Sequence, residues 1–287
     1  MRRTAKAPAS SANLGPGFDS LAVALGLYVE VAVSPRPQGL LVTAEGEGSE
    51  LARGGEHLAA QVVCSVLGHD RAHVHVRSEV PVARGLGSSA ALAVAAAAAA
   101  GAPEPLVAGF AVDGHPENAA ASALGGLVAA AVVEGSAVAR RLRLDPALRF
   151  VVLVPERRLS TAAARKALPE HVSHVDAAFN LSRMGLMVAG LADADGLLAA
   201  AAQDRLHQAA RSALFPESVP LLAGLLDAGA LASCWSGAGP SLLGICHAGV
   251  APAVATRTGE AMAALGVPGQ VLVLEADRTG VVVTEEA

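Results

Sequence analysis

The chain has 287 residues, of which 53% are hydrophobic and only 2% aromatic, and its formal net charge is −5. That length suits one large domain or two of medium size, with a core built from Ala, Val and Leu. Because no Lys and Arg cluster is present, the composition argues against nucleic-acid binding. The longest apolar run, the alanine tract 90–100, is too short and too weakly hydrophobic to span a bilayer.

The cysteines and the start of the chain predict a cytoplasmic location. Cys64, Cys234 and Cys246 form an odd, scattered set that suits a reducing compartment, and no CxxC spacing suggests zinc. The opening MRRTAKAPAS is basic, but no apolar stretch follows it as in a secretory signal.

In the first half, alternating and helical patterns follow one another without a strict βαβ order. The predicted elements are strands at 27–33 and 40–44, a loop at 45–56, a helix at 57–67, a strand at 73–80, an alanine helix at 88–100, a proline loop at 101–105, and a helix turning into a strand across 118–133. The break in the last segment is expected at Gly125-Gly126.

The second half opens with the β run 150–154 and is mostly helical after it. Helices are predicted from 161 and over 175–191, 197–210 and 219–228, with strands at 242–246 and 271–274. This mixture predicts an α+β protein. We expect a boundary in the turn around Asp145-Pro146, giving domains 1–147 and 148–287.

Three glycine-rich segments stand apart from these elements: PASSANLGPGFDS at 8–20, PVARGLGSSAA at 81–91 and SGAGPS at 236–241. In the middle one, Gly85 and Gly87 allow close backbone approach, and Ser88 and Ser89 open the alanine helix. A helix N-terminus with unpaired N–H groups is an anion site, so the segment can hold a polyphosphate without lysine. An ordinary serine-capped helix explains the segment equally well.

Other phosphate-loop and hydrolase patterns do not fit. The Walker pattern needs a lysine that is absent here, and a dinucleotide fingerprint needs a strand running directly into the glycines, where Pro81 intervenes. The G-x-S-x-G elbow of serine hydrolases fails because Cys234 stands at the first glycine position before Ser236.

In their order and spacing, the three segments resemble the motifs of the GHMP kinases, the superfamily of galactokinase, homoserine kinase and mevalonate kinase. The first segment is similar to the homoserine kinase signature within that superfamily. So are His115-Pro116-Glu117-Asn118 (usually H-P-D-N), Leu159-Ser160-Thr161 with Arg165, and Asp204-Arg205-Leu206-His207-Gln208 with Arg211. The resemblance runs from about Ala7 to the C-terminus.

The resemblance implies a two-domain kinase that phosphorylates L-homoserine with ATP and Mg²⁺ in threonine biosynthesis. The N-terminal half would resemble the ribosomal-protein S5 domain 2 fold, and the C-terminal half would be ferredoxin-like. The implied partners are ATP and L-homoserine, with no nucleic acid and no membrane, and a homodimer is compatible with the family.

The resemblance also implies roles for particular residues. ATP would lie on Pro81, Val82, Ala83, Arg84, Gly85, Leu86, Gly87, Ser88, Ser89, Ala90 and Ala91. The substrate would contact Asn13, Asp19, His115, Asn118, Thr161, Arg165 and Arg211. Ser89 and Asn118 are the expected catalytic residues, Ser89 through Mg²⁺ and Asn118 beside the attacking hydroxyl.

The chemistry of an α-amino acid agrees with this residue set. Asp19 suits the ammonium group, and an arginine fork suits the carboxylate in bidentate fashion. Asn118 cannot act as a base, but phosphoryl transfer needs mainly positioning and charge neutralisation. A mevalonate- or sugar-type kinase, whose substrate lacks the amino group, and a non-catalytic nucleotide or amino-acid binder remain as alternatives. Without a role in binding, Asp19 could cap the apolar stretch that follows it, and Arg165 and Arg211 could be solvent-exposed helix residues.

One position departs from the family. Homoserine kinases carry a metal-binding glutamate four or eight residues before the histidine of H-P-D-N, where this chain has Ala111 and Val107. Mg²⁺ takes only one or two carboxylates from a protein, so a nearby acid is a sufficient substitute. We expect Asp113 rather than Glu104 in that role; an exposed turn residue is the alternative for Asp113.

Overall fold

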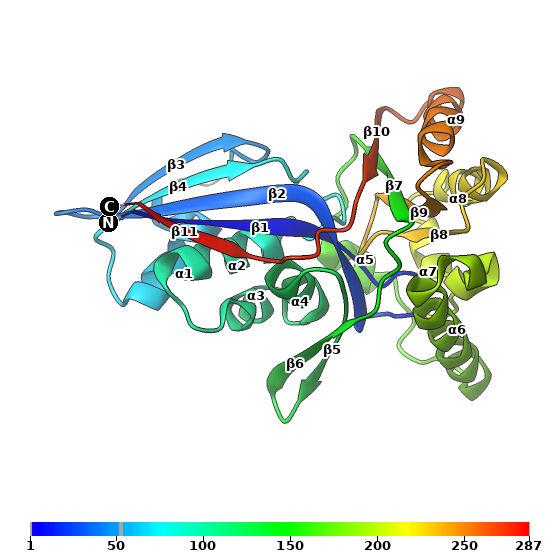
Figure 1. The fold of residues 1–287 in the computed structure, drawn as a ribbon, viewed down its shortest axis with the longest axis horizontal. Coiled ribbons are helices and arrows are strands. Elements are labelled where there is room, and N and C mark those ends of the chain that lie inside the picture. Colours follow the sequence, from blue (N-terminus) through cyan, green and yellow to red (C-terminus); the bar gives the residue numbers. More distant parts are fainter. Residues whose placement is uncertain (1, 52–53, 287) are drawn as a thin grey trace.

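The computed structural model describes residues 2–51 and 54–286, and its strands form two sheets (Figure 1). The first sheet has the order β11–β1–β2–β4–β3, and β5 pairs with the first residues of β2 and with β6. Its strands are β1 Arg2–Ala12, β2 Leu21–Pro35, β3 Leu41–Gly46, β4 Ala72–Ser78, β5 Leu127–Val133, β6 Ser136–Leu142 and β11 Val282–Glu286. Of these pairs, β3 and β4 run parallel and are joined through a helix, and the others are antiparallel.

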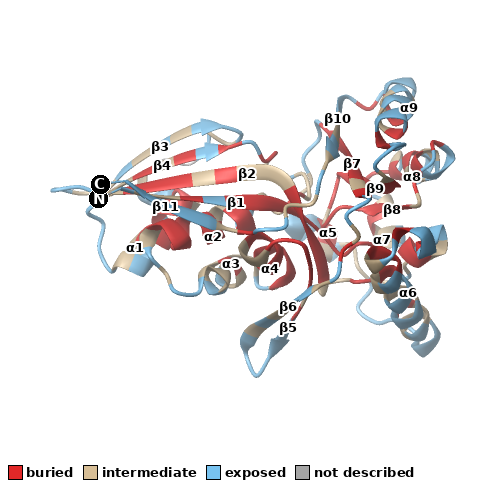
Figure 2. Ribbon diagram, viewed as in Figure 1, coloured by how far each residue is buried: buried red, intermediate tan, exposed pale blue. Residues whose placement is uncertain are grey.

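Helices cover one face of the first sheet. They are α1 Leu58–Leu67, α2 Ser88–Ala100, α3 Pro105–Asp113 and α4 Glu117–Leu124 (Figure 1). The alanine helix α2 packs on β1 and β2 and contacts the other three helices. Its methyl side chains allow this close approach from every side, and the buried colouring runs along it in Figure 2. A chain with few aromatics thus builds its core by bringing backbones together.

The second sheet is antiparallel, with the order β10–β7–β9–β8. Its strands are β7 Leu148–Pro155, β8 Ala232–Trp235, β9 Leu242–His247 and β10 Gly269–Leu274. The helices of this half are α5 Thr161–Lys166, α6 His174–Ala192, α7 Gln208–Ser212, α8 Ser218–Asp227 and α9 Ala251–Ala264. Helices α8 and α9 pack on the sheet. Among the described helices, none has the length and apolar character needed to cross a bilayer.

The architecture confirms the α+β prediction and most predicted elements, with corrections. The helix predicted over 197–210 is wrong: the chain there forms a 3-10 turn, Ala199–Ala202, and then α7. The reason is Asp204, whose carboxylate accepts hydrogen bonds from the backbone N–H groups of Leu206, His207 and Gln208 in place of helix carbonyls.

Several elements were not predicted. They are β1, α3, β6, β8, α9 and β11. Helix α3 was missed because the sequence pattern places Pro105 in a proline loop at 101–105. In the structure Pro105 is the first residue of the helix, a position where proline is favoured. In the predicted loop 45–56, residues 54–56 form a 3-10 turn, and residues 52–53 lie outside the described residues.

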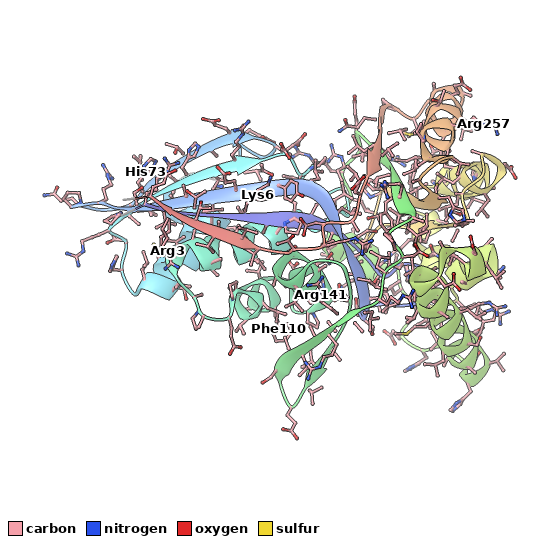
Figure 3. The ribbon with its side chains drawn as sticks, in the orientation of Figure 1. Arg3, Lys6, His73, Phe110, Arg141 and Arg257 are labelled. Atoms are coloured by element: carbon pink, nitrogen blue, oxygen red, sulfur yellow. The ribbon has the colours of Figure 1, made fainter. Side chains whose placement is uncertain are left out.

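The end of the chain returns to the first sheet. Strand β11 pairs with β1, and Arg3 of β1 forms an ion pair with Glu285 (Figure 3). Lys6 lies over the ring of Tyr28, whose hydroxyl donates to Asp277. Dividing the chain into 1–147 and 148–287 thus separates the two sheets except for β11. As a division into domains it stays a prediction.

The three glycine-rich segments meet where the two sheets approach each other. A Cβ added at Gly85, whose φ is +78°, would lie 2.2 Å from the backbone oxygen of Ser236. One added at Gly87 would lie 2.1 Å from Oγ of Ser10. The Ser236 hydroxyl donates to the carbonyl of Gly85, and the backbone N–H of Ser10 donates to the carbonyl of Leu86. The middle segment is therefore held against both others at backbone distance.

We predict that Gly85→Ala lowers the free energy of unfolding by roughly 2 kcal/mol or more, because it combines a left-handed backbone with a backbone clash. The matched control is Gly185→Ala in α6, where an added Cβ meets nothing within 4 Å. The control is expected to gain about 0.5–1 kcal/mol in urea denaturation, because Ala favours helix over Gly. Equal stabilities of the two variants would contradict the packing argument.

Candidate active site

A cavity of about 710 Å³ lies where the glycine-rich segments meet. The site residues expected from the sequence line this cavity, apart from Ala90 and Ala91. Those two are fully buried in the core, so only their backbone groups are available to a ligand. The cavity thus brings together residues from Asn13 to Arg211.

The N-terminus of α2 opens into the cavity. Gly87, with φ +64°, is the N-cap and supplies no side chain, so the first N–H groups of the helix are left without a side-chain partner. Ser88 and Ser89 follow with their hydroxyls at the cavity wall. This is the arrangement that binds phosphate at a helix end.

Arg84 lines the cavity but is engaged in holding the loop. Its guanidinium donates to the backbone carbonyls of Val82 and Pro155, both at 2.8 Å, and to that of Glu156. These bonds tie the loop to the end of β7. Arg84 therefore positions the loop before α2, and these bonds use three of its five N–H groups.

Asn13 and Asp19 lie in the loop between β1 and β2. Both have positive φ, +71° and +53°, values that Asn and Asp tolerate better than most residues. The Asn13 side chain accepts from the backbone N–H of Asp19 and donates to the carbonyl of Gly237. Asn13 therefore fixes Asp19, and its amide keeps a second N–H that these two bonds do not use.

Asp19 and Arg165 form a bidentate ion pair. The guanidinium of Arg165, on α5, donates to both Asp19 oxygens at 2.8 and 3.0 Å. This hydrogen bonding raises the pKa of Arg165 above its ordinary value. Thr161, the first residue of α5, lines the cavity beside this pair.

Arg211 is the second cation at this end of the cavity. It is 2% exposed, and burial, together with the charge of Arg165, lowers its pKa to about 10. Both guanidinium carbons lie 5.6 Å from the centre of the Phe18 ring. Two like charges are thus held beside one aromatic ring, and an anion that contacts both would offset their mutual repulsion.

His207 sets the orientation of Arg211. Its Nε2 bonds to the carbonyl of Gly15 at 2.8 Å, and its Nδ1 lies 2.9 Å from Nη1 of Arg211. Since a carbonyl can only accept and a guanidinium can only donate, the imidazole must be the neutral Nε2–H tautomer. Burial lowers the pKa of His207 from the ordinary 6.5 to about 4, consistent with that form.

His115, Glu117 and Asn118 stand at the start of α4 and also line the cavity. Glu117 is 1% exposed and accepts from Nδ1 of His115 at 2.9 Å and from Nδ2 of Asn118 at 3.2 Å. Burial acts to lower the pKa of His115, but the hydrogen bond to Glu117 and its negative charge outweigh it and raise that pKa. Oδ1 of Asn118 accepts from Ser10, so the amide is held on both sides.

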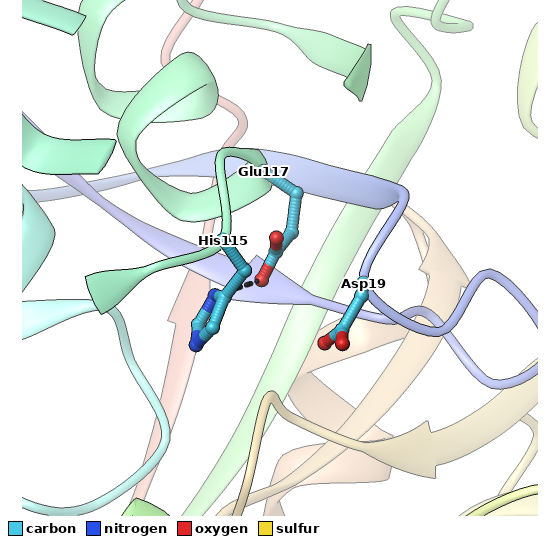
Figure 4. Close-up of side chains that lie close together, drawn as sticks. All are labelled: Asp19, His115 and Glu117. Carbon is cyan, nitrogen blue, oxygen red and sulfur yellow. Dashed lines mark hydrogen bonds and ion pairs between the residues drawn. The ribbon is translucent and has the colours of Figure 1, made fainter. Parts of the chain in front are cut away.

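Sequence reasoning missed Glu117 as a site residue, although it stands inside the H-P-E-N motif. Figure 4 shows its carboxylate between His115 and Asp19. The ligand atoms of these three side chains lie within 4.8 Å of one another. The signal was available, because Glu117 stands between His115 and Asn118, both of which were expected at the substrate.

Asp113 ends α3 and lines the cavity near Ser89. Burial raises the pKa of its carboxyl, while the charge of His115 and a hydrogen bond with Ser89 act in the opposite direction. Val107 and Ala111 are exposed, and Glu104 is the exposed cap residue of α3. Of the two acids weighed from the sequence, Asp113 is the one beside Ser89.

The far end of the cavity was not predicted at all. It is lined by Val29, Glu47, Leu51, Glu56, His57, Val76 and Ser78, which come from β2, β3–β4 and the start of α1. No motif joins these residues along the chain. Strand pairing brings Val29, Val76 and Ser78 together, and the segment between β3 and α1, tied to β4 by the bond from the Glu47 N–H to the Ser78 carbonyl, adds the others.

The neutral state of His207 predicts a pH dependence of stability. Because folding depresses its pKa, the unfolded chain takes up the proton first, and stability is lost as the pH falls from 6.5 towards 4. We expect the parent to lose of order 3 kcal/mol more than His207→Gln over that range. Gln keeps one donor and one acceptor, and the carboxylates titrate in both proteins. Parallel pH profiles in urea denaturation would contradict the assignment.

Comparison with known proteins places the chain in a family. Residues 56–126 match the GHMP kinases N terminal domain and residues 187–264 match the GHMP kinases C terminal family. The homoserine kinase of Mycolicibacterium vanbaalenii is 42% identical over 89% of this chain and 88% of its own length. That of Moorella thermoacetica is 39% identical over 91% and 93%.

A solved structure agrees over the whole length. The crystal structure of homoserine kinase from Cytophaga hutchinsonii superposes with a TM-score of 0.88 at 26% identity, over 99% of this chain and 97% of that one. The cavity, its helix N-terminus and its paired arginines are thus found in a chain that is similar to these enzymes from end to end. This chain belongs to the homoserine kinase family of the GHMP kinases.

Proposed function

We propose that this protein transfers the γ-phosphate of ATP to the side-chain hydroxyl of L-homoserine, giving O-phospho-L-homoserine for threonine biosynthesis. The observation that carries the proposal is the charge layout of the cavity. The Asp19 carboxylate and the guanidinium groups of Arg165 and Arg211 line the same cavity as the N-terminus of α2. Names and identities of the relatives support the same reaction.

The amino acid binds at the arginine end. Its carboxylate lies between Arg165 and Arg211, with Thr161 beside it, and its ammonium group faces Asp19. The side-chain hydroxyl then points towards His115 and Asn118. Since the Asn118 amide is held by Ser10 and Glu117, it presents a fixed donor to that hydroxyl oxygen.

The phosphates of ATP bind at the N-terminus of α2, on Gly85 to Ser89. Unpaired N–H groups and the positive end of the helix dipole stabilise their charge. The nucleoside occupies the far end of the cavity, between Leu51, His57 and Val76. Proton removal by a strong base is not required, because the loose transition state of phosphoryl transfer is stabilised mainly by position and charge.

The residues present fit a divalent cation such as Mg²⁺. The Ser89 hydroxyl and the Asp113 carboxylate are neighbouring oxygen donors facing the phosphate end, a set sufficient for a cation that keeps several waters. When bound, Mg²⁺ supplies neutralisation of the phosphate charge. We also propose a cytoplasmic location, supported by the free thiols of Cys64, Cys234 and Cys246; a homodimer stays a prediction.

The first test is ADP release with homoserine, serine, threonine and mevalonate offered in parallel. We expect homoserine to give the highest kcat/KM, because it alone joins both charges to a hydroxyl at the right distance. ADP release with mevalonate but not with homoserine would reject the assignment. No Mg²⁺-dependent turnover on any hydroxyl substrate would favour a non-catalytic binder.

Replacing Arg165 by lysine tests the carboxylate end. Arg165→Lys keeps the charge and loses the bidentate fork, so KM for homoserine should rise by about one to two decades. KM for ATP should change little. The control is Arg205→Lys, an exposed arginine paired with Asp176; it should leave both constants unchanged. A shift in the ATP constant instead would place Arg165 in the nucleotide site or in the fold.

An Mg²⁺ titration tests the metal end. Asp113→Asn should raise the Mg²⁺ concentration needed for half-maximal rate, because an amide is a weaker ligand than a carboxylate. Glu104→Gln, at the other end of the same helix, is the matched control and should not shift the titration. Identical curves for Asp113→Asn and the parent would reject Asp113 as a metal ligand.

A further inference from the structure

The two groups assigned to opposite ends of the substrate are bonded to each other. Asp19 and Arg165 form a two-point ion pair, with side chains 33% and 36% exposed. While the pair is intact, both Asp19 oxygens and both terminal nitrogens of Arg165 are bonded to each other. An amino acid whose carboxylate takes the Arg165 fork and whose ammonium takes the Asp19 carboxylate therefore competes with this pair.

The two partners differ in how firmly they are placed. Asp19 is fixed by its backbone, which has φ +53° and donates its N–H to Asn13. Arg165 reaches the pair through a long side chain from a six-residue helix, and the Arg211 guanidinium carbon lies at the same distance, 5.6 Å, from the centre of the same Phe18 ring. Arg165 is thus the partner that can turn, and a second guanidinium is already in place beside it.

A second anion stands ready beside Asp19. The Oε1 atom of Glu117 is bonded to His115 and Asn118, whereas Oε2 is buried with no hydrogen-bond partner among the described residues. Asp19, His115 and Glu117 place ligand atoms within 4.8 Å of one another (Figure 4). An ammonium group has three N–H donors, so a position between two carboxylates satisfies it better than Asp19 alone.

We propose that the Asp19–Arg165 ion pair occupies the empty amino-acid site and that a zwitterion exchanges with it. The α-ammonium takes Asp19 together with Glu117, and the α-carboxylate takes Arg165 together with Arg211. The net charge of the site is unchanged, and every group that loses a partner gains another. This inference rests on the proposed amino-acid substrate and adds Glu117 as a residue that determines specificity.

The exchange makes recognition conditional on both charges. A ligand that carries only a carboxylate, such as 4-hydroxybutyrate, draws Arg165 away and leaves Asp19 unpaired beside Glu117. A ligand that carries only an ammonium, such as 3-aminopropan-1-ol, leaves Arg165 unpaired beside Arg211. Each must break the ion pair without replacing both halves of it.

Equilibrium binding of homoserine and these two analogues, measured by calorimetry without ATP, tests the exchange. Asp19→Asn frees Arg165 in advance, so it should bind 4-hydroxybutyrate about fivefold or more tighter than the parent, while homoserine binds about tenfold or more weaker. Asn tolerates the left-handed backbone of position 19. Conversely, Arg165→Gln frees Asp19 in advance, so this variant should bind 3-aminopropan-1-ol more tightly than the parent does.

Glu117→Gln is the charge-matched control. It removes one negative charge nearby and leaves the ion pair intact, so its gain for 4-hydroxybutyrate should be smaller than that of Asp19→Asn. It should also bind homoserine and 3-aminopropan-1-ol more weakly than the parent. Unchanged affinities for these two ligands would overturn the part assigned to Glu117.

The exchange is overturned if Asp19→Asn does not bind 4-hydroxybutyrate more tightly and Arg165→Gln does not bind 3-aminopropan-1-ol more tightly than the parent. It is also overturned if Asp19→Asn and Glu117→Gln gain equally for 4-hydroxybutyrate, because the gain would then come only from the loss of a negative charge. The test is separate from turnover. A parent that binds homoserine but releases no ADP rejects the proposed reaction and leaves the exchange standing. A parent that phosphorylates homoserine while its variants show no gain rejects the exchange alone.

Discussion

The close packing of three glycine-rich segments is the constraint on which the rest of the site depends. Gly85 touches the backbone of the third segment, and Gly87 touches Ser10 of the first, at distances that exclude any side chain. Because of these contacts, the N-terminus of α2 faces the loop that holds Asp19. The phosphate end and the amino-acid end of the cavity are therefore placed relative to each other by backbone contact.

Charge in the cavity is arranged so that few groups are left without a partner. His207 is kept neutral by burial and turns Arg211 towards the cavity, while Asp19 and Arg165 satisfy each other. The exceptions among the described residues of this site are the Oε2 atom of Glu117 and the Nε atom of Arg211. Burying a carboxylate oxygen without a hydrogen-bond partner lowers the stability of the fold. Because this oxygen of Glu117 lies beside Asp19, a bound cation would supply the missing partner.

Much of the site could be predicted from the sequence, because it is built from short continuous segments such as 81–91 and 204–208. Residues within such a segment are close in space whatever the rest of the fold. The far end of the cavity could not be predicted, since Leu51, His57 and Val76 are far apart in the sequence and meet only through strand pairing and the course of the segment between β3 and α1. Arg84 and Asn13 line the cavity, and contact with ligands stays a prediction for both; their bonds to backbone partners, which hold the loops, could not be read from the sequence. Strand β11 was missed because its pairing partner lies at the other end of the chain.

The central claim is that phosphate from ATP reaches the side-chain oxygen of homoserine inside this cavity. Phosphorus–proton correlation NMR of the reaction mixture tests it most directly. The account predicts a new phosphomonoester whose phosphorus couples to the C4 methylene protons of homoserine, formed only with enzyme, ATP and Mg²⁺ together. Inorganic phosphate alone, or a phosphate coupled to any other position, would contradict it.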